Sequence, residues 1–177
     1  MGFLHMKPNK EKEKALLHET LIKLLDYNIN TGLFTWKCNR SGSAKKGTVA
    51  GAFKHTSGYV VIKVMGNIYL AHRLAWFYVY KVWPNNLIDH IDRDKHNNKL
   101  NNLREATYID NNRNSLIHGS NTSGSRGVFF DTSINKWRSQ IYINKVRHNL
   151  GTYNTIEEAT IAYTTEAKKV FGDFYNG

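Results

Sequence analysis

The sequence predicts an α+β protein built from two small domains. Residues 1–118 mix helical spacing of apolar residues with strand-like runs. Residues 122–177 contain three strand-like runs followed by one amphipathic helix, which is typical of a three-stranded antiparallel sheet packed on a helix. A chain of 177 residues is long enough for two such domains.

The first helix is predicted over residues 10–27, where leucines and isoleucine recur near helical spacing between lysines and glutamates. The segment Asn28 to Gly32 should end it. Leu33 to Trp36 has the composition of a short strand. A loop rich in glycine, serine and lysine follows, with one short strand expected at Val49 to Phe53.

A hairpin and a buried helix are predicted next. Tyr59 to Met65 and Asn67 to Leu70 have strand composition, and Gly66-Asn67 between them is a hairpin signal. The apolar run His72 to Tyr80 predicts a buried helix, which Pro84 should end. His72 lies in this apolar run and is expected to be a satisfied core histidine, although a phosphate contact is an alternative.

The C-terminal strands are predicted at residues 127–130, 137–143 and 146–150. Thr155 and Glu158 form a capping-box pattern at the start of the final helix. The apolar face expected on this helix consists of Ala159, Ala162, Tyr163, Ala167, Val170 and Phe171. Strand alternation places Trp137, Ser139 and Ile141, and likewise Val146, His148 and Leu150, toward the helix.

Charge and cysteine content narrow the functional classes. The net charge of +11 favours a polyanionic partner such as nucleic acid. Cys38 is the sole cysteine, so no intrachain disulfide and no cysteine-based zinc cluster can form. The sequence has no apolar run long enough for a membrane span or a secretory signal, so we expect a soluble protein without a membrane partner.

Residues 88–114 are far richer in Asp, Asn and His than a loop requires. Phosphodiester hydrolysis needs a base near neutral pKa, which histidine supplies, and a cation held by carboxylate or amide oxygens. His90 beside Asp89 offers that combination. Asp92 and Asp94 are expected to be turn formers, because aspartate accepts hydrogen bonds from its own backbone.

The run Asp89-His90-Ile91-Asp92, then Asn98 to Leu103, then Asn111, resembles the HNH homing endonucleases of phages, and the resemblance covers residues 15–114. It implies a ββα-metal nuclease core at about residues 70–115 within an N-terminal domain. It implies that His90 is the general base, that Asn102 orients His90, and that Asp89 and Asn111 bind a divalent metal ion. The oxygen ligands favour Mg²⁺ or Mn²⁺, and a phage-encoded protein would act in the cytoplasm of the host cell.

Residues 122–177 resemble the plant ethylene-response-factor (Apetala-type) DNA-binding domain. The resemblance rests on Arg126-Gly127-Val128, Lys136-Trp137, Leu150-Gly151-Thr152-Tyr153 and Glu157-Glu158-Ala159. It implies that the sheet lies in the major groove of double-stranded DNA with the helix behind it. The DNA contacts predicted for the whole chain are Arg73, Arg104, Arg126, Arg138, Gln140, Tyr142, Arg147 and Asn149.

The sequence therefore predicts a metal-dependent DNA endonuclease, acting as a monomer or as a DNA-induced dimer. Two alternatives stay open. One is a catalytically silent DNA-binding regulator on a nuclease fold, which would bind DNA without cutting it. The other is an RNA-directed nuclease or RNA binder, which competition between duplex DNA and structured RNA would reveal.

Overall fold

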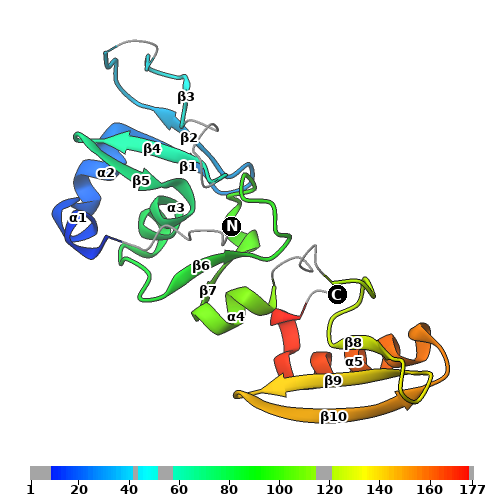
Figure 1. The fold of residues 1–177 in the computed structure, drawn as a ribbon. Coiled ribbons are helices and arrows are strands. Elements are labelled where there is room, and N and C mark those ends of the chain that lie inside the picture. The colour runs from blue at the N-terminus through cyan, green and yellow to red at the C-terminus, as the bar shows by residue number, and fades with distance from the viewer. Residues whose placement is uncertain (1–8, 42–43, 52–57, 115–120, 176–177) are drawn as a thin grey trace. The chain divides into compact units, whose positions relative to one another are not determined.

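The computed structural model describes residues 9–41, 44–51, 58–114 and 121–175 (Figure 1). The chain divides into two compact units, Met1–Tyr108 and Ile109–Gly177. The domain boundary predicted at residue 118 lies outside the described residues. In the described part of the chain, no helix has the length and apolar character required to cross a membrane.

The first unit begins with two short helices, α1 (Lys10–Ala15) and α2 (His18–Leu24), and strand β1 (Leu25–Asn28) follows at once. The single helix predicted over residues 10–27 is therefore wrong. Leu25 and Tyr27 are buried on one face of β1, while the residues between and after them are exposed. Pairing with the next strand outweighs the local helical spacing of the leucines.

Strand β2 (Leu33–Trp36) lies between β1 and β3 (Val49–Ala50) in an antiparallel sheet. The predicted strand at residues 33–36 is confirmed. The strand predicted to reach Phe53 is confirmed only for its first two residues, and residues 52–53 lie outside the described part of the chain. The sheet contributes Phe34, Trp36 and Ala50 to the core of this unit.

The predicted hairpin is formed by β4 (Val61–Val64) and β5 (Asn67–Leu70). Its turn residues are Met65 and Gly66, both with positive φ, so the turn lies one residue earlier than predicted. Helix α3 (Ala71–Tyr80) follows and is buried as predicted. It ends at Lys81, whose left-handed backbone stops the helix before Pro84 is reached.

A second hairpin carries the polar cluster of the sequence. Strand β6 (Leu87–His90) pairs antiparallel with β7 (Leu103–Ala106), and the 3₁₀ turn η1 (Leu100–Asn102) precedes β7. Helix α4 (Tyr108–Arg113) follows directly. This order of strand, strand and helix is the order that the predicted nuclease core requires.

The second unit contains β8 (Val128–Asp131), β9 (Lys136–Ile143) and β10 (Val146–Tyr153), which form one antiparallel sheet with β9 in the middle. Helix α5 (Ile156–Phe171) packs on it, and η2 (Gly172–Phe174) ends the unit. The three strands and the capping box at Thr155 are confirmed. The core under α5 is formed by Ile141, Ala167 and Phe171. Of the other predicted apolar residues of the helix, Ala159 is fully buried, and Ala162, Tyr163 and Val170 are partly buried.

Two residues of β10 differ from expectation. Val146 and His148 pair with Ile143 and Ile141 and so share their side of the sheet, yet both are exposed. The turn that joins β9 to β10 extends beyond the end of α5, so the helix does not cover this part of the sheet (Figure 1).

Arg73 is buried inside the first unit, where it joins α1 to α3. Its guanidinium bonds Glu13 through Nε (2.5 Å) and Nη2 (2.9 Å), and both residues are about 5% exposed or less. The same group donates to the carbonyl oxygens of Pro84 and Asn86. The predicted DNA contact by Arg73 is therefore wrong, because its donors are used inside the protein.

Glu13→Gln should destabilise the first unit by about 3–5 kcal/mol, because it leaves the buried guanidinium of Arg73 without its counter-charge. Glu11→Gln is the matched control, since Glu11 is exposed on the same helix. Urea denaturation of both variants measures the difference. Equal midpoints for the two variants would show that the pair is not needed for the fold.

Candidate active site

Asp89 and His90 end strand β6 and are both buried, at 5% and 4% exposure. Polar and ionisable side chains are rarely buried unless they have partners or a function. The cross-strand partners in the hairpin are Arg104 for Asp89 and Leu103 for His90. The two side chains therefore start from one strand end but have different neighbours.

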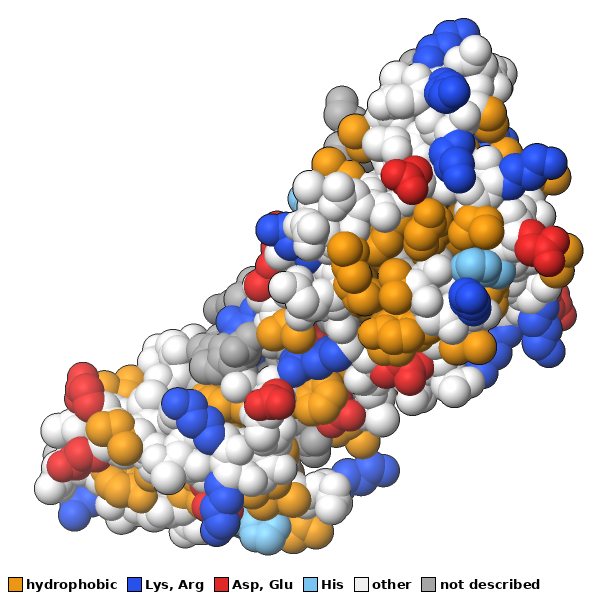
Figure 2. Space-filling model, turned by 180° about the vertical axis from the view of Figure 1, so that it is seen from behind, with side chains coloured by type: hydrophobic (Ala, Val, Ile, Leu, Met, Phe, Trp, Pro, Cys, Tyr) orange, Lys and Arg blue, Asp and Glu red, His pale blue; other side chains and the backbone are white. Residues whose placement is uncertain are grey.

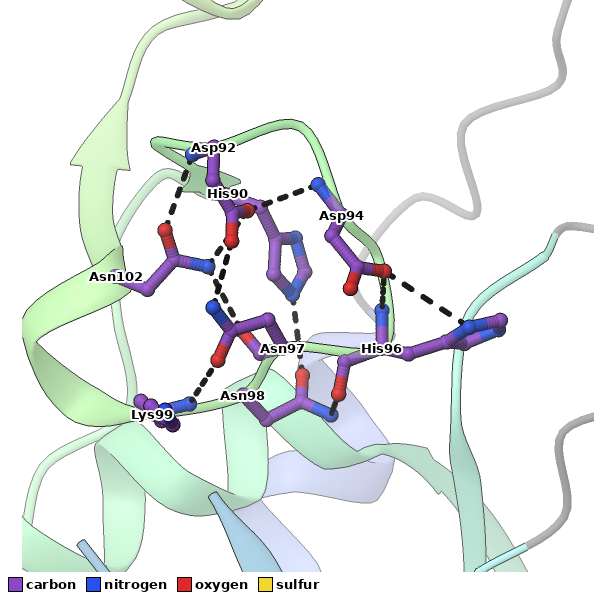
Figure 3. Close-up of polar contacts among 8 residues, drawn as sticks. All are labelled: His90, Asp92, Asp94, His96, Asn97, Asn98, Lys99 and Asn102. Carbon is purple, nitrogen blue, oxygen red and sulfur yellow. Dashed lines mark hydrogen bonds and ion pairs between the residues drawn. The ribbon is translucent and has the colours of Figure 1, made fainter. Parts of the chain in front are cut away.

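The ring of His90 is held by Asn98. Nε2 of His90 lies 3.1 Å from Oδ1 of Asn98, and Nδ2 of Asn98 donates to the carbonyl of His96 at 3.2 Å (Figure 3). That second bond sets the amide so that its oxygen faces the ring. His90 therefore donates from Nε2, and the neutral ring carries its lone pair on Nδ1.

The sequence predicted that Asn102 would orient His90, but the structure assigns that contact to Asn98. Asn98 is buried, and its backbone carbonyl accepts a hydrogen bond from the Tyr27 hydroxyl at 2.7 Å. No local feature of the sequence separates Asn98 from the other asparagines of this segment. The strand β1 that supplies Tyr27 was also predicted as helix.

Asn102 instead closes the loop between β6 and β7. Its Nδ2 donates to Oδ1 of Asp92 (2.9 Å) and to the carbonyl of Asn97 (2.8 Å), and its Oδ1 accepts from the Asp92 amide (Figure 3). Burial acts to raise the pKa of Asp92, but hydrogen bonds from Asn97 and Asn102 outweigh it and lower that pKa. The expected turn roles are confirmed, since Asp92 accepts from the Asp94 amide and Asp94 from the His96 amide.

Two rings pack against His90. Tyr59 stacks on it with centroids 5.9 Å apart, and His72 meets it edge to face at 5.0 Å. Burial lowers the pKa of His90, while Asn98 and the nearby carboxylates partly oppose that shift. The imidazole is thus neutral at neutral pH, which is the form that can accept a proton.

His72 is buried as expected but is not a satisfied core histidine. Its Nδ1 has no hydrogen-bond partner among the described residues. Burial, together with the charges of His90 and Arg73, holds the pKa of His72 well below its usual value. His72 therefore stays neutral next to His90, and the alternative of a direct phosphate contact remains a prediction.

Asp89 forms an ion pair with Arg104. Both Nη2 (2.7 Å) and Nε (2.9 Å) of the arginine contact Oδ2 of the carboxylate. Arg104, predicted to contact DNA, has a side chain that is 14% exposed. The described part of the chain contains no group of three His, Cys, Asp or Glu side chains suited to a metal ion.

The oxygen-donor chemistry of the predicted metal ligands fits a hard divalent cation, since Asp89 supplies a carboxylate and Asn111 an amide oxygen. Asn111 lies on α4 in the second unit, and Asp89 lies in the first. The approach of Asn111 to Asp89 and His90 remains a prediction.

The sheet of the second unit presents the predicted DNA-contacting side chains on one face. Register pairs Tyr142 with Arg147 and Gln140 with Asn149, and paired residues share a face. Arg138 shares this face and is ion-paired with Asp131. Phe129, paired with Arg138 and 40% exposed, belongs to the same face and was not predicted. Arg126 precedes β8 and is half-buried.

Basic side chains also gather at the end of the first unit that carries β2 and β3 (Figure 2). The sequence there supplies Lys37, Arg40, Lys45 and Lys46. Arg40 lies over the ring of Trp36 at 4.6 Å. The glycine- and lysine-rich composition of residues 38–58 predicts a loop, and its lysines are the local signal for this basic surface.

Comparison with known proteins agrees with this geometry. The family model described as HNH endonuclease matches residues 69–113, from β5 through α4. A protein of Acanthamoeba polyphaga mimivirus described as an uncharacterized HNH endonuclease is 32% identical over 120 residues, which are 67% of this chain and 61% of the relative. Protein 3.8 of Escherichia phage T7 is 32% identical over 87 residues, or 49% of this chain and 71% of the relative. No solved structure matches the chain.

The chain thus spans about three-fifths of the length of its mimivirus relative. The family match ends at residue 113, so the Apetala-type resemblance of residues 122–177 remains a prediction. The matched segment contains Asp89, His90, Asn98 and Asn102, the residues that build the buried site. The chain therefore contains an HNH endonuclease domain at residues 69–113.

Proposed function

We propose that this protein is a metal-dependent endonuclease that hydrolyses phosphodiester bonds in double-stranded DNA. The observation that carries the proposal is the buried, neutral His90, held by Asn98 beside Asp89 within the segment that matches the HNH family. A neutral imidazole in a fixed tautomer is the form that a general base requires.

In the proposed reaction, Nδ1 of His90 accepts a proton from a water molecule as that water attacks the phosphorus. The new bond joins the water oxygen to phosphorus, and the bond from phosphorus to the 3′ oxygen of the leaving strand breaks. The products are a 5′-phosphate and, after protonation, a 3′-hydroxyl. Asn98 keeps the Nε2 proton in place throughout, so the lone pair stays on Nδ1.

Asp89 and Asn111 are the residues proposed to hold the metal ion, and their oxygen donors favour Mg²⁺ or Mn²⁺. When bound, the ion would offset charge on the phosphate and on the leaving oxygen. The protein itself supplies the proton acceptor, His90, and the residue that orients it, Asn98, in buried surroundings.

DNA binding is proposed for the exposed sheet face of the second unit, in the manner of an Apetala-type domain. Arg138, Gln140, Tyr142, Arg147 and Asn149 share that face. Such side chains reach phosphates and base edges, which supports a site-preferring, homing-type nuclease. Arg126 and the basic end of the first unit would add phosphate contacts, and the net charge of +11 agrees with this.

The setting and assembly state are also proposals. One relative is a phage protein, which supports a phage-encoded enzyme acting in the cytoplasm of a host cell. One site per chain cuts one strand for each binding event, so double-strand cleavage would need a second copy. We propose a monomer that can pair on DNA.

A catalytically silent DNA-binding regulator is the second candidate. The ion pair between Asp89 and Arg104 favours it, since it occupies a carboxylate that the nuclease needs for metal. Retained DNA binding without any metal-dependent cleavage would select this alternative.

His90→Ala should abolish metal-dependent nicking of supercoiled plasmid, with a loss of at least about 10²-fold, because the proton acceptor is gone. His96→Ala is the control, since His96 is a half-exposed histidine of the same loop. Gel assays with Mg²⁺ and with EDTA measure both variants. Equal cleavage by His90→Ala and the wild type would refute the role of His90.

Asn98→Ala should lower kcat about 10–100-fold and leave KM nearly unchanged, because His90 loses the acceptor that fixes its tautomer. Asn101→Ala, an exposed asparagine of the same segment, is the matched control. Single-turnover cleavage, with thermal melting to confirm folding, makes the comparison. A change confined to KM would contradict the orienting role of Asn98.

Arg147→Gln should weaken duplex binding and reduce the slope of log K against log salt by about 1, as expected for one lost phosphate contact. Lys168→Gln is the control, because Lys168 is an exposed cation on α5, which packs on the other side of the sheet. Fluorescence anisotropy at several salt concentrations measures both. An unchanged salt slope would exclude the Arg147 contact.

A further inference from the structure

Arg104 and Asp89 form an ion pair next to the general base. They are directly opposed in the β6–β7 hairpin, and two nitrogens of the guanidinium share a single carboxylate oxygen at 2.7 and 2.9 Å. Asp89 is buried beneath this contact. The carboxylate is therefore already neutralised by a cation that belongs to the chain itself.

A divalent ion on the same carboxylate would meet that guanidinium at close range. Like charges held near one buried group repel strongly, because little solvent screens them. Binding of the ion is therefore opposed for as long as Arg104 keeps its bonds to Asp89. The pair and the metal compete for one carboxylate.

Arg104 differs from the fully buried Arg73 in having some exposure. Its side chain is 14% exposed, whereas that of Arg73 is 3% exposed. A guanidinium presents two parallel donors that fit a phosphate as well as a carboxylate. A DNA phosphate arriving at the site is thus a second acceptor of the right shape and charge.

We propose that Arg104 exchanges its partner during substrate binding, leaving Asp89 for a DNA phosphate beside the bond to be cut and so freeing the carboxylate for the metal ion. This inference rests on the proposed function. It makes DNA and metal binding mutually favourable, because each removes a competitor of the other. Without DNA, the site binds metal weakly, which limits cutting away from the substrate complex.

The test is a titration of Mn²⁺ followed by electron paramagnetic resonance, a readout that does not require cleavage. All proteins carry His90→Ala, so that added duplex DNA stays intact. Arg104→Gln should bind Mn²⁺ at least tenfold more tightly than the His90→Ala parent in the absence of DNA. Added duplex should tighten Mn²⁺ binding to the parent but change that of Arg104→Gln little.

Lys23→Gln is the control, because it also removes a positive charge from the first unit, at an exposed residue of helix α2. It should bind Mn²⁺ like the parent. If Arg104→Gln unfolds at a lower temperature than the parent, Arg104→Lys replaces it as the test variant. A lysine ammonium cannot present the two parallel N–H donors of a guanidinium to the Asp89 carboxylate. Arg104→Lys should bind Mn²⁺ more tightly than the parent without DNA.

Mn²⁺ affinity that is equal or weaker in the folded Arg104 variant overturns the exchange. If the wild-type protein still nicks plasmid with Mg²⁺ in that case, the exchange of Arg104 is refuted but the proposed endonuclease function is not. If the parent binds no Mn²⁺ with or without DNA and the wild type never cuts, the proposed function fails as well.

Discussion

The burial of His90 is the constraint on which the rest of the site depends. A buried imidazole is favoured in its neutral form, and one ring nitrogen then needs an acceptor while the other keeps its lone pair. Asn98 provides that acceptor only because its own amide is set by the His96 carbonyl and its backbone by the Tyr27 hydroxyl. The orientation of one proton therefore depends on a strand more than sixty residues earlier in the sequence.

The asparagines around His90 make different hydrogen bonds, and the sequence alone does not predict which asparagine makes which bond. Asn102 and Asp92 tie the two ends of the loop together, and Asn97 donates to the other oxygen of Asp92 at 2.6 Å. This leaves Asn98 buried at the level of the imidazole (Figure 3). Amides suit such a loop because each can donate and accept at once without bringing a charge into the interior.

Two arginine–carboxylate ion pairs in the first unit have the same chemistry but different surroundings. Arg73 is held by Glu13 and two carbonyls, so its donors are committed and it acts as an internal tie between helices. Arg104 is held by Asp89 at the end of an active-site hairpin, with part of its side chain in reach of solvent. The first pair is fixed by the fold, and the second is the pair for which we propose an exchange with a phosphate.

The sequence by itself determined the elements whose signals are local. The capping box at Thr155, the three C-terminal strands, the buried helix of residues 72–80 and the pairing of Asp89 with His90 in one motif all follow from neighbouring residues. The tertiary structure decided the features that depend on distant partners. Leu25 to Asn28 became a strand because β2 lies beside it, and Asn98 rather than Asn102 bonds His90 because Tyr27 and the loop closure place it there. Arg73 is buried because it forms an ion pair with Glu13, sixty residues away in the sequence. A charged side chain is stable in the interior only when the fold places a counter-charge beside it.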